Sequence, residues 1–231
     1  MTDPEQQILR SWQTNAAPWV RAVRNREIAS RRQVTDAAII EAIKNCQPTR
    51  VLDIGCGEGW LARRLTQEGI KVAGVDACAA LIESARAAGG AAEYYLLDYQ
   101  QLVTGELQQH VDALVCNFSL FGEASVERLL SSLHALLNPN GYLLIQTLHP
   151  KAVCGDMPYE DGWRDGNWQG FSEDFSDPAP WFFRTQDSWL ALFARTGWRC
   201  ERLVEPTYQD GRLASMLFIC TQTVCPSRAM L

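Results

Sequence analysis

The chain has 231 residues, of which 47% are hydrophobic, and its formal net charge is −6. This size is sufficient for one large hydrophobic core, so we expect a single domain that spans residues 1–231. The acidic balance disfavours a broad nucleic-acid surface, because phosphate binding relies on clustered Lys and Arg. The first residues lack the pattern of a signal peptide, and no apolar run reaches the length of a membrane span, which predicts a cytoplasmic protein with no membrane contact.

The three histidines and eight cysteines are dispersed along the sequence, without a close cysteine pair at metal-ligand spacing. We therefore predict no metal site and interpret the cysteines as reduced, mostly buried residues. The cysteines are Cys46, Cys56, Cys78, Cys116, Cys154, Cys200, Cys220 and Cys225.

Residues 1–46 are predicted to form an N-terminal helical cap. Helix starts are indicated at residues 2–4, 15–18 and 35–36, and the apolar residues between 38 and 43 have helical spacing. Six arginines crowd this segment, namely Arg10, Arg21, Arg24, Arg26, Arg31 and Arg32. A solvated helix face is favoured over a site for an acidic substrate.

The most informative motif is a β-branched strand followed by a glycine-rich turn, at residues 51–59. The glycines, which allow a sharp turn and a close approach of backbone N–H groups to a ligand, are Gly55, Gly57 and Gly59, with Cys56 between the first two. The third glycine of a dinucleotide fingerprint would fall at Trp60, which argues against NAD. Asp53 would repel a pyrophosphate but attract an ammonium group, which favours S-adenosylmethionine.

Three further strands are predicted at residues 71–76, 93–97 and 111–116, and each ends in polar or aromatic groups. The second strand ends in Asp76, followed by Ala77, and an acid here could accept both ribose hydroxyls, in NAD enzymes as well. After the third strand come Asp98, which could accept the adenine amino group, and Tyr99, which could stack or pack. After the fourth come Asn117, Phe118 and Ser119. An open α/β sheet binds its ligand at such strand ends.

The remaining pattern completes the sheet. We predict a helix over residues 125–137 closed by a turn at 138–141, a fifth strand at 142–148, a helix from 185 to 197, and an antiparallel pair at 198–205 and 213–223. The expected fold is a Rossmann-like, doubly wound α/β sheet of seven mostly parallel strands with a C-terminal antiparallel hairpin strand. Residues 47–148 and 185–225 would form its cofactor-binding core.

These motifs resemble those of the class I S-adenosylmethionine-dependent methyltransferases, over about residues 35–223. The resemblance implies S-adenosylmethionine as cofactor and S-adenosylhomocysteine as product. It also implies cofactor contacts for the glycine loop, for the three strand-end acids, and for the segment after the fourth strand, which would lie beside the methyl group. The implied residues are Asp53, Gly55, Cys56, Gly57, Gly59, Asp76, Ala77, Asp98, Tyr99, Asn117, Phe118 and Ser119.

The long insertion at residues 149–184 is predicted to be a substrate lid. Its aromatic residues alternate with acids, which suits a pocket for an apolar or flat acceptor and would repel a phosphate backbone. The alternative is that these rings only pack the insertion on the core. The candidate substrate-binding residues are Trp12 and Trp19 of the cap and Tyr159, Trp163, Trp168 and Trp181 of the lid.

Methyl transfer from a sulfonium needs mainly positioning, so a catalytic base is optional. His149, at the end of the fifth strand, is the first candidate, although it could simply hydrogen-bond the strand end; Tyr159 is the second.

The predicted reaction is in-line methyl transfer to a small molecule, by resemblance to the quinone and natural-product group of methyltransferases. The segment after the fourth strand lacks the Pro-Pro-aromatic sequence of exocyclic amino-group methyltransferases, and no Pro-Cys nucleophile is present. A methyltransferase acting on RNA or protein, a nucleoside-binding protein without transferase activity, and a misread NAD oxidoreductase remain as alternatives. The sequence leaves the acceptor and the oligomeric state open.

Overall fold

The computed structural model describes residues 3–223. Five sequence-based expectations extend beyond this range: the single domain over residues 1–231, the N-terminal cap from residue 1, the helix start at residue 2, the end of the core segment at residues 224–225, and Cys225 as a reduced cysteine. Those parts of the expectations lie outside the described residues.

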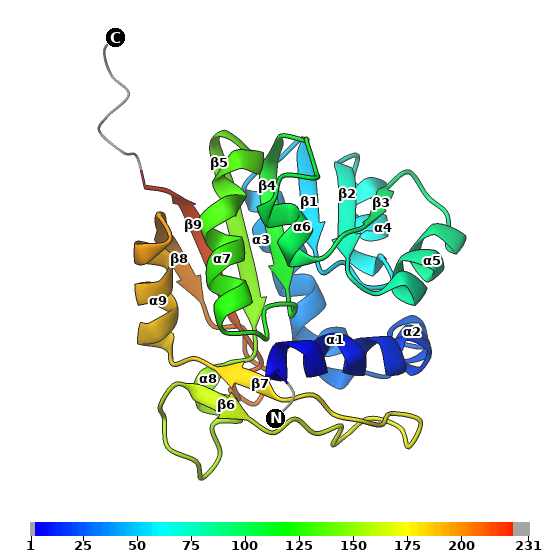
Figure 1. Ribbon diagram of the computed structural model, residues 1–231, viewed down its shortest axis with the longest axis vertical. Coiled ribbons are helices and arrows are strands. Elements are labelled where there is room, and N and C mark those ends of the chain that lie inside the picture. Colours follow the sequence, from blue (N-terminus) through cyan, green and yellow to red (C-terminus); the bar gives the residue numbers. More distant parts are fainter. Residues whose placement is uncertain (1–2, 224–231) are drawn as a thin grey trace.

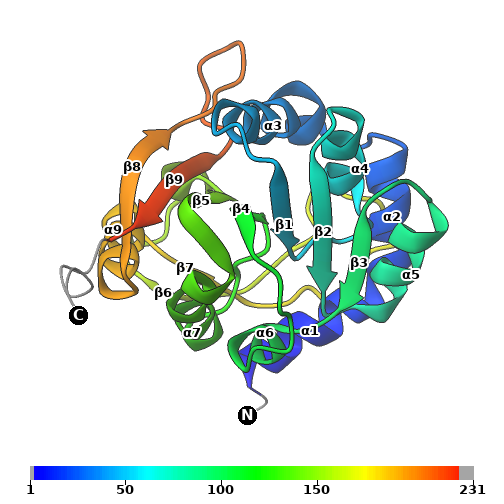
Figure 2. The same ribbon diagram turned by 90° about the horizontal axis from the view of Figure 1, so that it is seen from above.

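A seven-stranded sheet with the order β3-β2-β1-β4-β5-β9-β8 forms the centre of the structure (Figure 2). The strands are β1 (Arg50–Ile54), β2 (Lys71–Asp76), β3 (Glu93–Leu96), β4 (Val111–Asn117), β5 (Leu137–Thr147), β8 (Trp198–Val204) and β9 (Met216–Gln222). The first five strands pair in parallel, and β9 runs antiparallel between β5 and β8. The predicted Rossmann-like sheet with a C-terminal antiparallel strand is confirmed.

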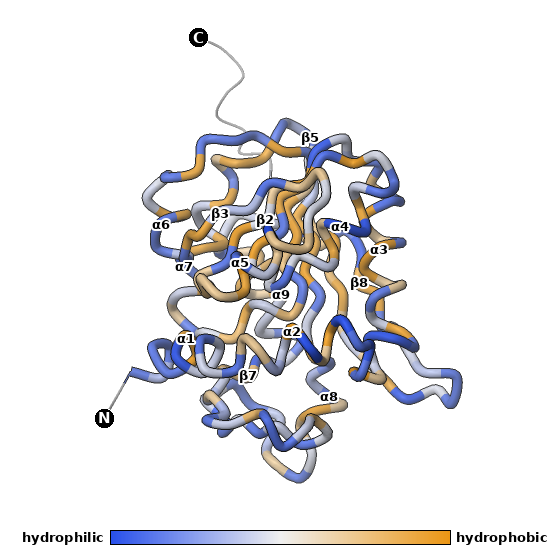
Figure 3. Tube along the Cα trace, turned by 90° about the vertical axis from the view of Figure 1, so that its right-hand side faces the viewer, coloured by the Kyte–Doolittle hydropathy of each residue, from blue (hydrophilic) through white to orange (hydrophobic). Residues whose placement is uncertain are grey.

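Helices cover both faces of the sheet (Figure 2). One face carries α3 (Asp36–Asn45), α4 (Trp60–Gln67) and α5 (Ala79–Ala87), and the other carries α6 (Tyr99–Val103), α7 (Ala124–Ser132) and α9 (Gln186–Arg195). Alternate strand residues enter the two cores, as a pleated strand requires: Val51 packs toward α3 and α4, and Leu52 packs toward α7. The hydrophobic residues accordingly concentrate along the strands in Figure 3, while the outer loops are hydrophilic.

The segment between α7 and β5 differs from the prediction. The helix ends at Ser132, a 3-10 helix covers Leu133–Leu136, and β5 already begins at Leu137. Residues 138–141, which we predicted to be a turn before the strand, form a bulge inside it, opposite Asp112 of β4. Asn138 donates a hydrogen bond of 2.8 Å to the Asp112 carboxylate, which holds the bulge against the neighbouring strand.

The N-terminal helices and the insertion lie together across the carboxyl ends of the parallel strands (Figure 1). The N-terminal part comprises α1 (Pro4–Thr14), α2 (Ala16–Arg24) and a π-helical turn (Arg31–Thr35), and the insertion comprises α8 (Pro150–Val153) and the antiparallel pair β6 (Gly162–Arg164) and β7 (Trp181–Phe183). The helix starts predicted at residues 2–4 and 15–18 are confirmed at α1 and α2. The start predicted at residues 35–36 is wrong, because the backbone is already helical from residue 29 through the π-helical turn, and Thr35 lies inside it without a side-chain cap bond. In the described part of the chain, none of the helices combines the length and the apolar character that crossing a membrane requires.

Candidate active site

The glycine loop turns the chain from β1 into α4 through left-handed backbone conformations. Gly55, Gly57 and Gly59 have φ values of +75°, +57° and +80°, which residues with a side chain rarely adopt. Space is also restricted, because a Cβ atom at Gly59 would lie 2.5 Å from the Tyr94 hydroxyl oxygen. A Cβ at Gly55 would overlap the side chain of Ser119. The loop therefore requires glycine both for its backbone angles and for its contacts.

Two carboxyl groups, Asp53 and Asp76, lie beside this loop. Asp53 is 2% exposed, and burial together with the nearby Asp76 raises the pKa of its carboxyl to about 7. Asp76 accepts hydrogen bonds of 2.8 Å from the backbone N–H groups of Gly57 and Cys78. Burial raises the pKa of Asp76, and these bonds oppose the rise. Each Asp76 oxygen keeps a second lone pair, so the carboxylate retains the capacity to accept further hydroxyl donors.

Asp98 and Tyr99 connect the end of β3 to the rest of the site. Asp98 is the N-cap of α6 and forms a capping box with Gln101, with bonds of 2.8 Å and 3.0 Å. The Tyr99 hydroxyl donates a 2.8 Å hydrogen bond to the carbonyl of Ser119. Burial raises the pKa of this phenol. One Asp98 oxygen thus has a structural partner, and the Tyr99 ring packs on the larger core cluster.

The segment after β4 carries both a strained residue and an unsatisfied one. Phe118 has φ +53°, which is rare for a bulky side chain and is typical of functional positions. The Oδ1 atom of Asn117 is buried without a hydrogen-bond partner. Ser119 donates 2.7 Å to the carbonyl of Ile54, which ties the end of β4 to the end of β1. The structure therefore brings the predicted cofactor residues to one edge of the sheet.

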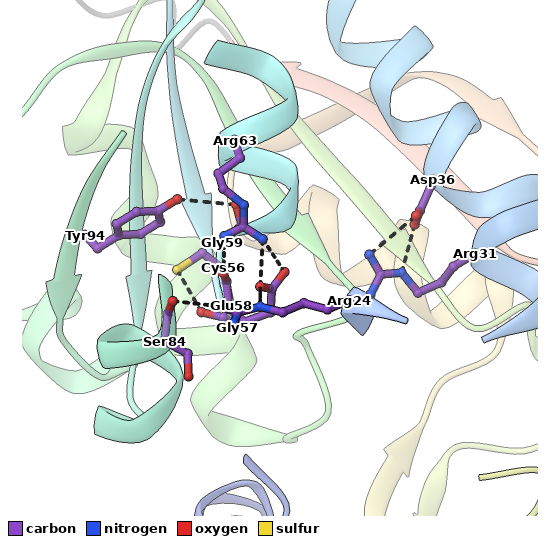
Figure 4. Close-up of polar contacts among 10 residues, drawn as sticks. All are labelled: Arg24, Arg31, Asp36, Cys56, Gly57, Glu58, Gly59, Arg63, Ser84 and Tyr94. Atoms are coloured by element: carbon purple, nitrogen blue, oxygen red, sulfur yellow. Dashed lines mark hydrogen bonds and ion pairs between the residues drawn. The ribbon is translucent and has the colours of Figure 1, made fainter. Parts of the chain in front are cut away.

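A buried ion network supports the glycine loop from outside, and sequence reasoning missed it (Figure 4). The side chain of Glu58 is fully buried and accepts bonds of 2.7 Å and 2.8 Å from Arg63 of α4. Arg24 of α2 reaches the same carboxylate at 3.1 Å and donates 2.9 Å to the carbonyl of Ser84. The only local signal is the acid inside the glycine motif, five residues before an arginine. Arg24 links the N-terminal cap to the loop and to α5.

Trp12, Trp19 and Trp168 form an aromatic cluster over the loop. The ring centroids of Trp12 and Trp19 are 5.1 Å apart, and those of Trp12 and Trp168 are 6.0 Å apart. The Trp19 indole nitrogen lies 3.6 Å from the position that a Cβ atom of residue 57 would occupy. Phe171 and Phe175 of the insertion extend the cluster. The cap and the insertion thus meet above the glycine loop.

Hydrogen bonds fasten the cap to the insertion at the same place. Asn15 is fully buried; its amide donates 2.7 Å to the carbonyl of Ser176 and accepts 2.9 Å from the Ser176 N–H. Ser11 donates 2.6 Å to the carbonyl of Asp177. These bonds were not foreseen from the sequence, because their partners are more than 160 positions apart.

The other three candidate substrate residues lie on or near the β6–β7 pair. Trp163 stacks edge-on against Phe182 and donates 3.2 Å to the Glu123 carboxylate. Tyr159 is 40% exposed, and its hydroxyl accepts 3.1 Å from the N–H of Gln186. Trp181 lines a small cavity, described below. The six predicted substrate residues therefore divide into two groups.

His149 is fully buried and has partners on both ring nitrogens. Nδ1 accepts a 3.2 Å bond from the N–H of Lys151, which caps α8, so the proton resides on Nε2. Nε2 donates 2.9 Å to the Glu205 carboxylate. This geometry matches the alternative reading, a side chain that hydrogen-bonds the strand end. That His149 acts as a base stays a prediction. To accept a proton at Nδ1, His149 would first have to lose the hydrogen bond from the N–H of Lys151.

A cavity of about 10 Å³, which we call the β4–β5 cavity, lies beyond the ends of these two strands. This volume holds roughly one water molecule. Its walls include Leu120 and Phe121 after β4, Thr147 and Leu148 at the end of β5, and Phe182 and Arg184 of the insertion.

Known proteins are similar to this chain in sequence and in fold. The ubiquinone biosynthesis O-methyltransferase of Histophilus somni is 32% identical over 108 residues, which are 43% of this chain and 45% of that protein. An uncharacterized protein of Haemophilus influenzae is 24% identical over 200 residues, 74% of this chain and 76% of that protein. The chain thus spans about half the length of the O-methyltransferases that it matches.

Solved structures of S-adenosylmethionine-dependent methyltransferases share the fold. The Burkholderia thailandensis 1,6-didemethyltoxoflavin-N1-methyltransferase, with bound 1,6-didemethyltoxoflavin and S-adenosylhomocysteine, superposes with a TM-score of 0.68 at 15% identity, covering 97% of this chain and 92% of that one. A putative S-adenosylmethionine-dependent methyltransferase of Listeria monocytogenes superposes with a TM-score of 0.63 at 16% identity, covering 81% of this chain and 99% of that one.

The family model of the methyltransferase domain matches residues 24–203, which is most of the chain. This match and the shared fold confirm the resemblance inferred from the sequence, with S-adenosylmethionine as the cofactor. The chain belongs to the methyltransferase domain family.

Proposed function

We propose that the protein transfers the methyl group of S-adenosylmethionine, by in-line displacement, to a small acceptor with an apolar or aromatic body. The observation that supports this proposal is the double cover of aromatic side chains over the carboxyl ends of the strands, contributed by the cap and the insertion. The names of similar proteins agree, since they include methyltransferases of ubiquinone biosynthesis and of a toxoflavin precursor.

The cofactor would bind at the point where the strand order reverses, between β1 and β4. Asp53 would receive the ammonium group of its methionine part, and Asp76 the ribose hydroxyls. Asp98 and Tyr99 would border the adenine. The buried Oδ1 of Asn117, which has no hydrogen-bond partner among residues 3–223, would accept a hydrogen bond from a donor group of the ligand.

Bound S-adenosylmethionine supplies a methyl group already activated by the sulfonium. The protein then has to hold the acceptor atom in line with that methyl group and exclude water, which the aromatic walls accomplish. The acceptor would lie on the β4–β5 side, because the glycine loop and Asp76 occupy the β1–β2 side. His149 and Tyr159 remain the candidate bases.

The alternative of an RNA or protein substrate has less support. Three of the six cap arginines have acidic partners among the described residues: Arg21 pairs with Asp174 at 2.6 Å, Arg24 with Glu58 at 3.1 Å and Arg31 with Asp36 at 2.9 Å. Their charge is therefore partly neutralised before any polyanion could bind.

The proposal is tested with methyl-tritiated S-adenosylmethionine and a whole-cell extract, after which small molecules are separated from precipitated RNA and protein. Label in a soluble compound other than unreacted S-adenosylmethionine supports the proposal and allows the acceptor to be purified. An Asp76→Ala variant serves as the control for cofactor-dependent labelling. Label confined to the precipitate would favour a macromolecular substrate, and its absence from both fractions would favour a binding protein without transferase activity.

A further inference from the structure

Arg184 is a buried cation with incomplete hydrogen bonding. The residue is 4% exposed, and its Nη2 donates 3.0 Å to the backbone carbonyl of Glu123. Its Nη1 is buried without a partner. Within residues 3–223, no carboxylate lies at ion-pair distance from this guanidinium. Buried charges are normally paired, so this arrangement needs an explanation.

The acids that act on Arg184 are already committed to other partners. Asp161 accepts bonds from the N–H of Thr185 and from the Ser188 hydroxyl. The carboxylate of Glu123 accepts from the Trp163 indole. Burial lowers the pKa of the Arg184 guanidinium to about 10, so the group still carries its charge at neutral pH. The guanidinium carbon lies 4.7 Å from the ring centroid of Phe182 and 5.0 Å from that of Trp189, and these ring faces compensate part of the charge.

A second buried arginine in the same region, Arg164, has hydrogen-bond partners for its guanidinium. Arg164 is 7% exposed and also lies over an aromatic ring, at 3.5 Å from the centroid of Phe183. Its guanidinium donates to the carbonyl of Pro158 at 2.7 Å and to that of Cys154 at 3.4 Å. Arg184 differs by its free Nη1 and by its position on the wall of the β4–β5 cavity.

The β4–β5 cavity places this cation where the proposed acceptor would lie. The cavity adjoins the loop after β4 and the end of β5, next to the reversal of strand order where the cofactor would bind. Apart from Arg184 and Thr147, its wall side chains are apolar or aromatic. Phe121, Phe182 and Trp181 are only half-buried, so these rings form the side from which a ligand would enter.

We propose that Arg184 binds a carboxylate group of the methyl acceptor, so that the substrate is an aromatic or apolar acid and not a neutral compound. The inference rests on the proposed function, because it takes the β4–β5 cavity as the acceptor end of that site. A planar carboxylate matches the guanidinium fork and would satisfy Nη1 with a charge-assisted hydrogen bond. The aromatic body of the acid would enter the cavity by separating the half-buried rings.

Matched acids and amides test this directly with the full chain. Protein saturated with S-adenosylhomocysteine is titrated calorimetrically with benzoate, 2-naphthoate and indole-3-acetate, and with the corresponding neutral amides. We expect at least one acid to bind about tenfold or more tightly than its amide, the effect of one charged hydrogen bond. If no acid in the series binds better than its amide, the proposal is overturned.

Variants show whether Arg184 is responsible. Arg184→Gln should abolish the preference for the acid, and Arg184→Lys should retain part of it while losing the fork geometry. Arg199→Gln is the matched control: it removes a positive charge from β8, where Arg199 is exposed and pairs with Glu201 at 2.5 Å, and should leave the preference unchanged. An acid preference that survives in Arg184→Gln would overturn the proposal.

Binding of S-adenosylhomocysteine distinguishes a failure of the proposed function from a failure of the inference about Arg184. Each variant should bind this product with wild-type affinity, which also shows that it folds. A wild-type protein that does not bind the product would contradict the proposed function itself. A protein that binds the product but shows no acid preference contradicts only the inference about Arg184.

Discussion

The buried carboxyl of Asp53 should make cofactor affinity depend on pH. Its pKa is raised from 3.8 to about 7, because the group is buried and Asp76 is close. The ammonium group of the cofactor attracts only the ionised form, so binding below this pKa must release a proton. Affinity should therefore rise with pH until the carboxyl is ionised. Asp53→Asn is the informative perturbation, because it removes the titration while conserving shape.

The size of the effect follows from the ionised fraction. With a pKa of about 7, affinity should increase about 25-fold between roughly pH 5.5 and pH 7.5. The free energy of unfolding of the cofactor-free protein should change with pH in the opposite direction. Since the folded-state pKa lies above the unfolded value, the stabilisation is complete below about pH 4 and is lost as the pH rises through 7, by up to about 4 kcal/mol.

Calorimetric titration with S-adenosylhomocysteine across this range, in buffers of different ionisation enthalpy, measures affinity and proton release together. Asp53→Asn should bind more weakly at neutral pH and show a flatter profile. Asp76→Asn is the companion variant: it removes the neighbouring charge that helps to raise the pKa of Asp53, so the rise in affinity with pH should persist but move to lower pH. A wild-type affinity that does not change with pH, or an unchanged slope in Asp53→Asn, would refute the reasoning.

Three further outcomes are expected. Asp76→Ala should weaken cofactor binding by about 1.5–3 kcal/mol, roughly ten- to a hundredfold, because the ribose bonds are lost; unchanged affinity in titration would remove Asp76 from the site. Asn15→Ala should lower the free energy of unfolding by about 2 kcal/mol and speed proteolysis near Ser176, since buried backbone groups lose their partners; equal cleavage rates would show that the bonds do not hold the insertion. A hydrogen bond from the Cys220 thiol lowers the pKa of the half-buried Cys200 thiol, so Cys200 should react with iodoacetamide faster than the buried cysteines of residues 3–223; Cys220→Ala should shift that reaction to higher pH, and an unchanged pH profile would show that the bond does not activate Cys200.

That the candidate cofactor residues lie at one edge of the sheet was predictable, because the signals for this arrangement are local. A strand, a glycine turn and a helix follow one another within about twenty residues, and strand-end acids recur in step with the βα units. The parallel strands then bring Asp53 and Asp76 to one edge without further information. The same local reasoning was wrong at residues 138–141, where an Asn-Pro-Asn-Gly sequence typical of a turn forms a bulge inside β5, because Asp112 on the neighbouring strand holds it there.

For the proposed acceptor site, the sequence predicted only that aromatic residues would cover it, and not how they are arranged. The aromatic content of the insertion indicated a cover over the site. The six candidate substrate residues divide into two groups because of contacts between residues far apart in the sequence, and such contacts leave no local pattern. Asn15 gives no sign of its bonds to Ser176, and Arg184 reads as an ordinary arginine until its burial and its free Nη1 are seen. Glu58 likewise has the appearance of a solvated loop residue, although its side chain is fully buried.

The ties between Asn15 and Ser176 also have a consequence for synthesis on the ribosome. The amide of Asn15 meets its partners only after a further 161 residues have been made, which at about 5–20 residues per second takes on the order of ten seconds or more. Until then Trp12 and Trp19 lack the rings of the insertion that cover them in the finished protein. The cap thus reaches its final environment long after it emerges from the ribosome, and until then the packing of α2 against α5 is available to cover Trp19.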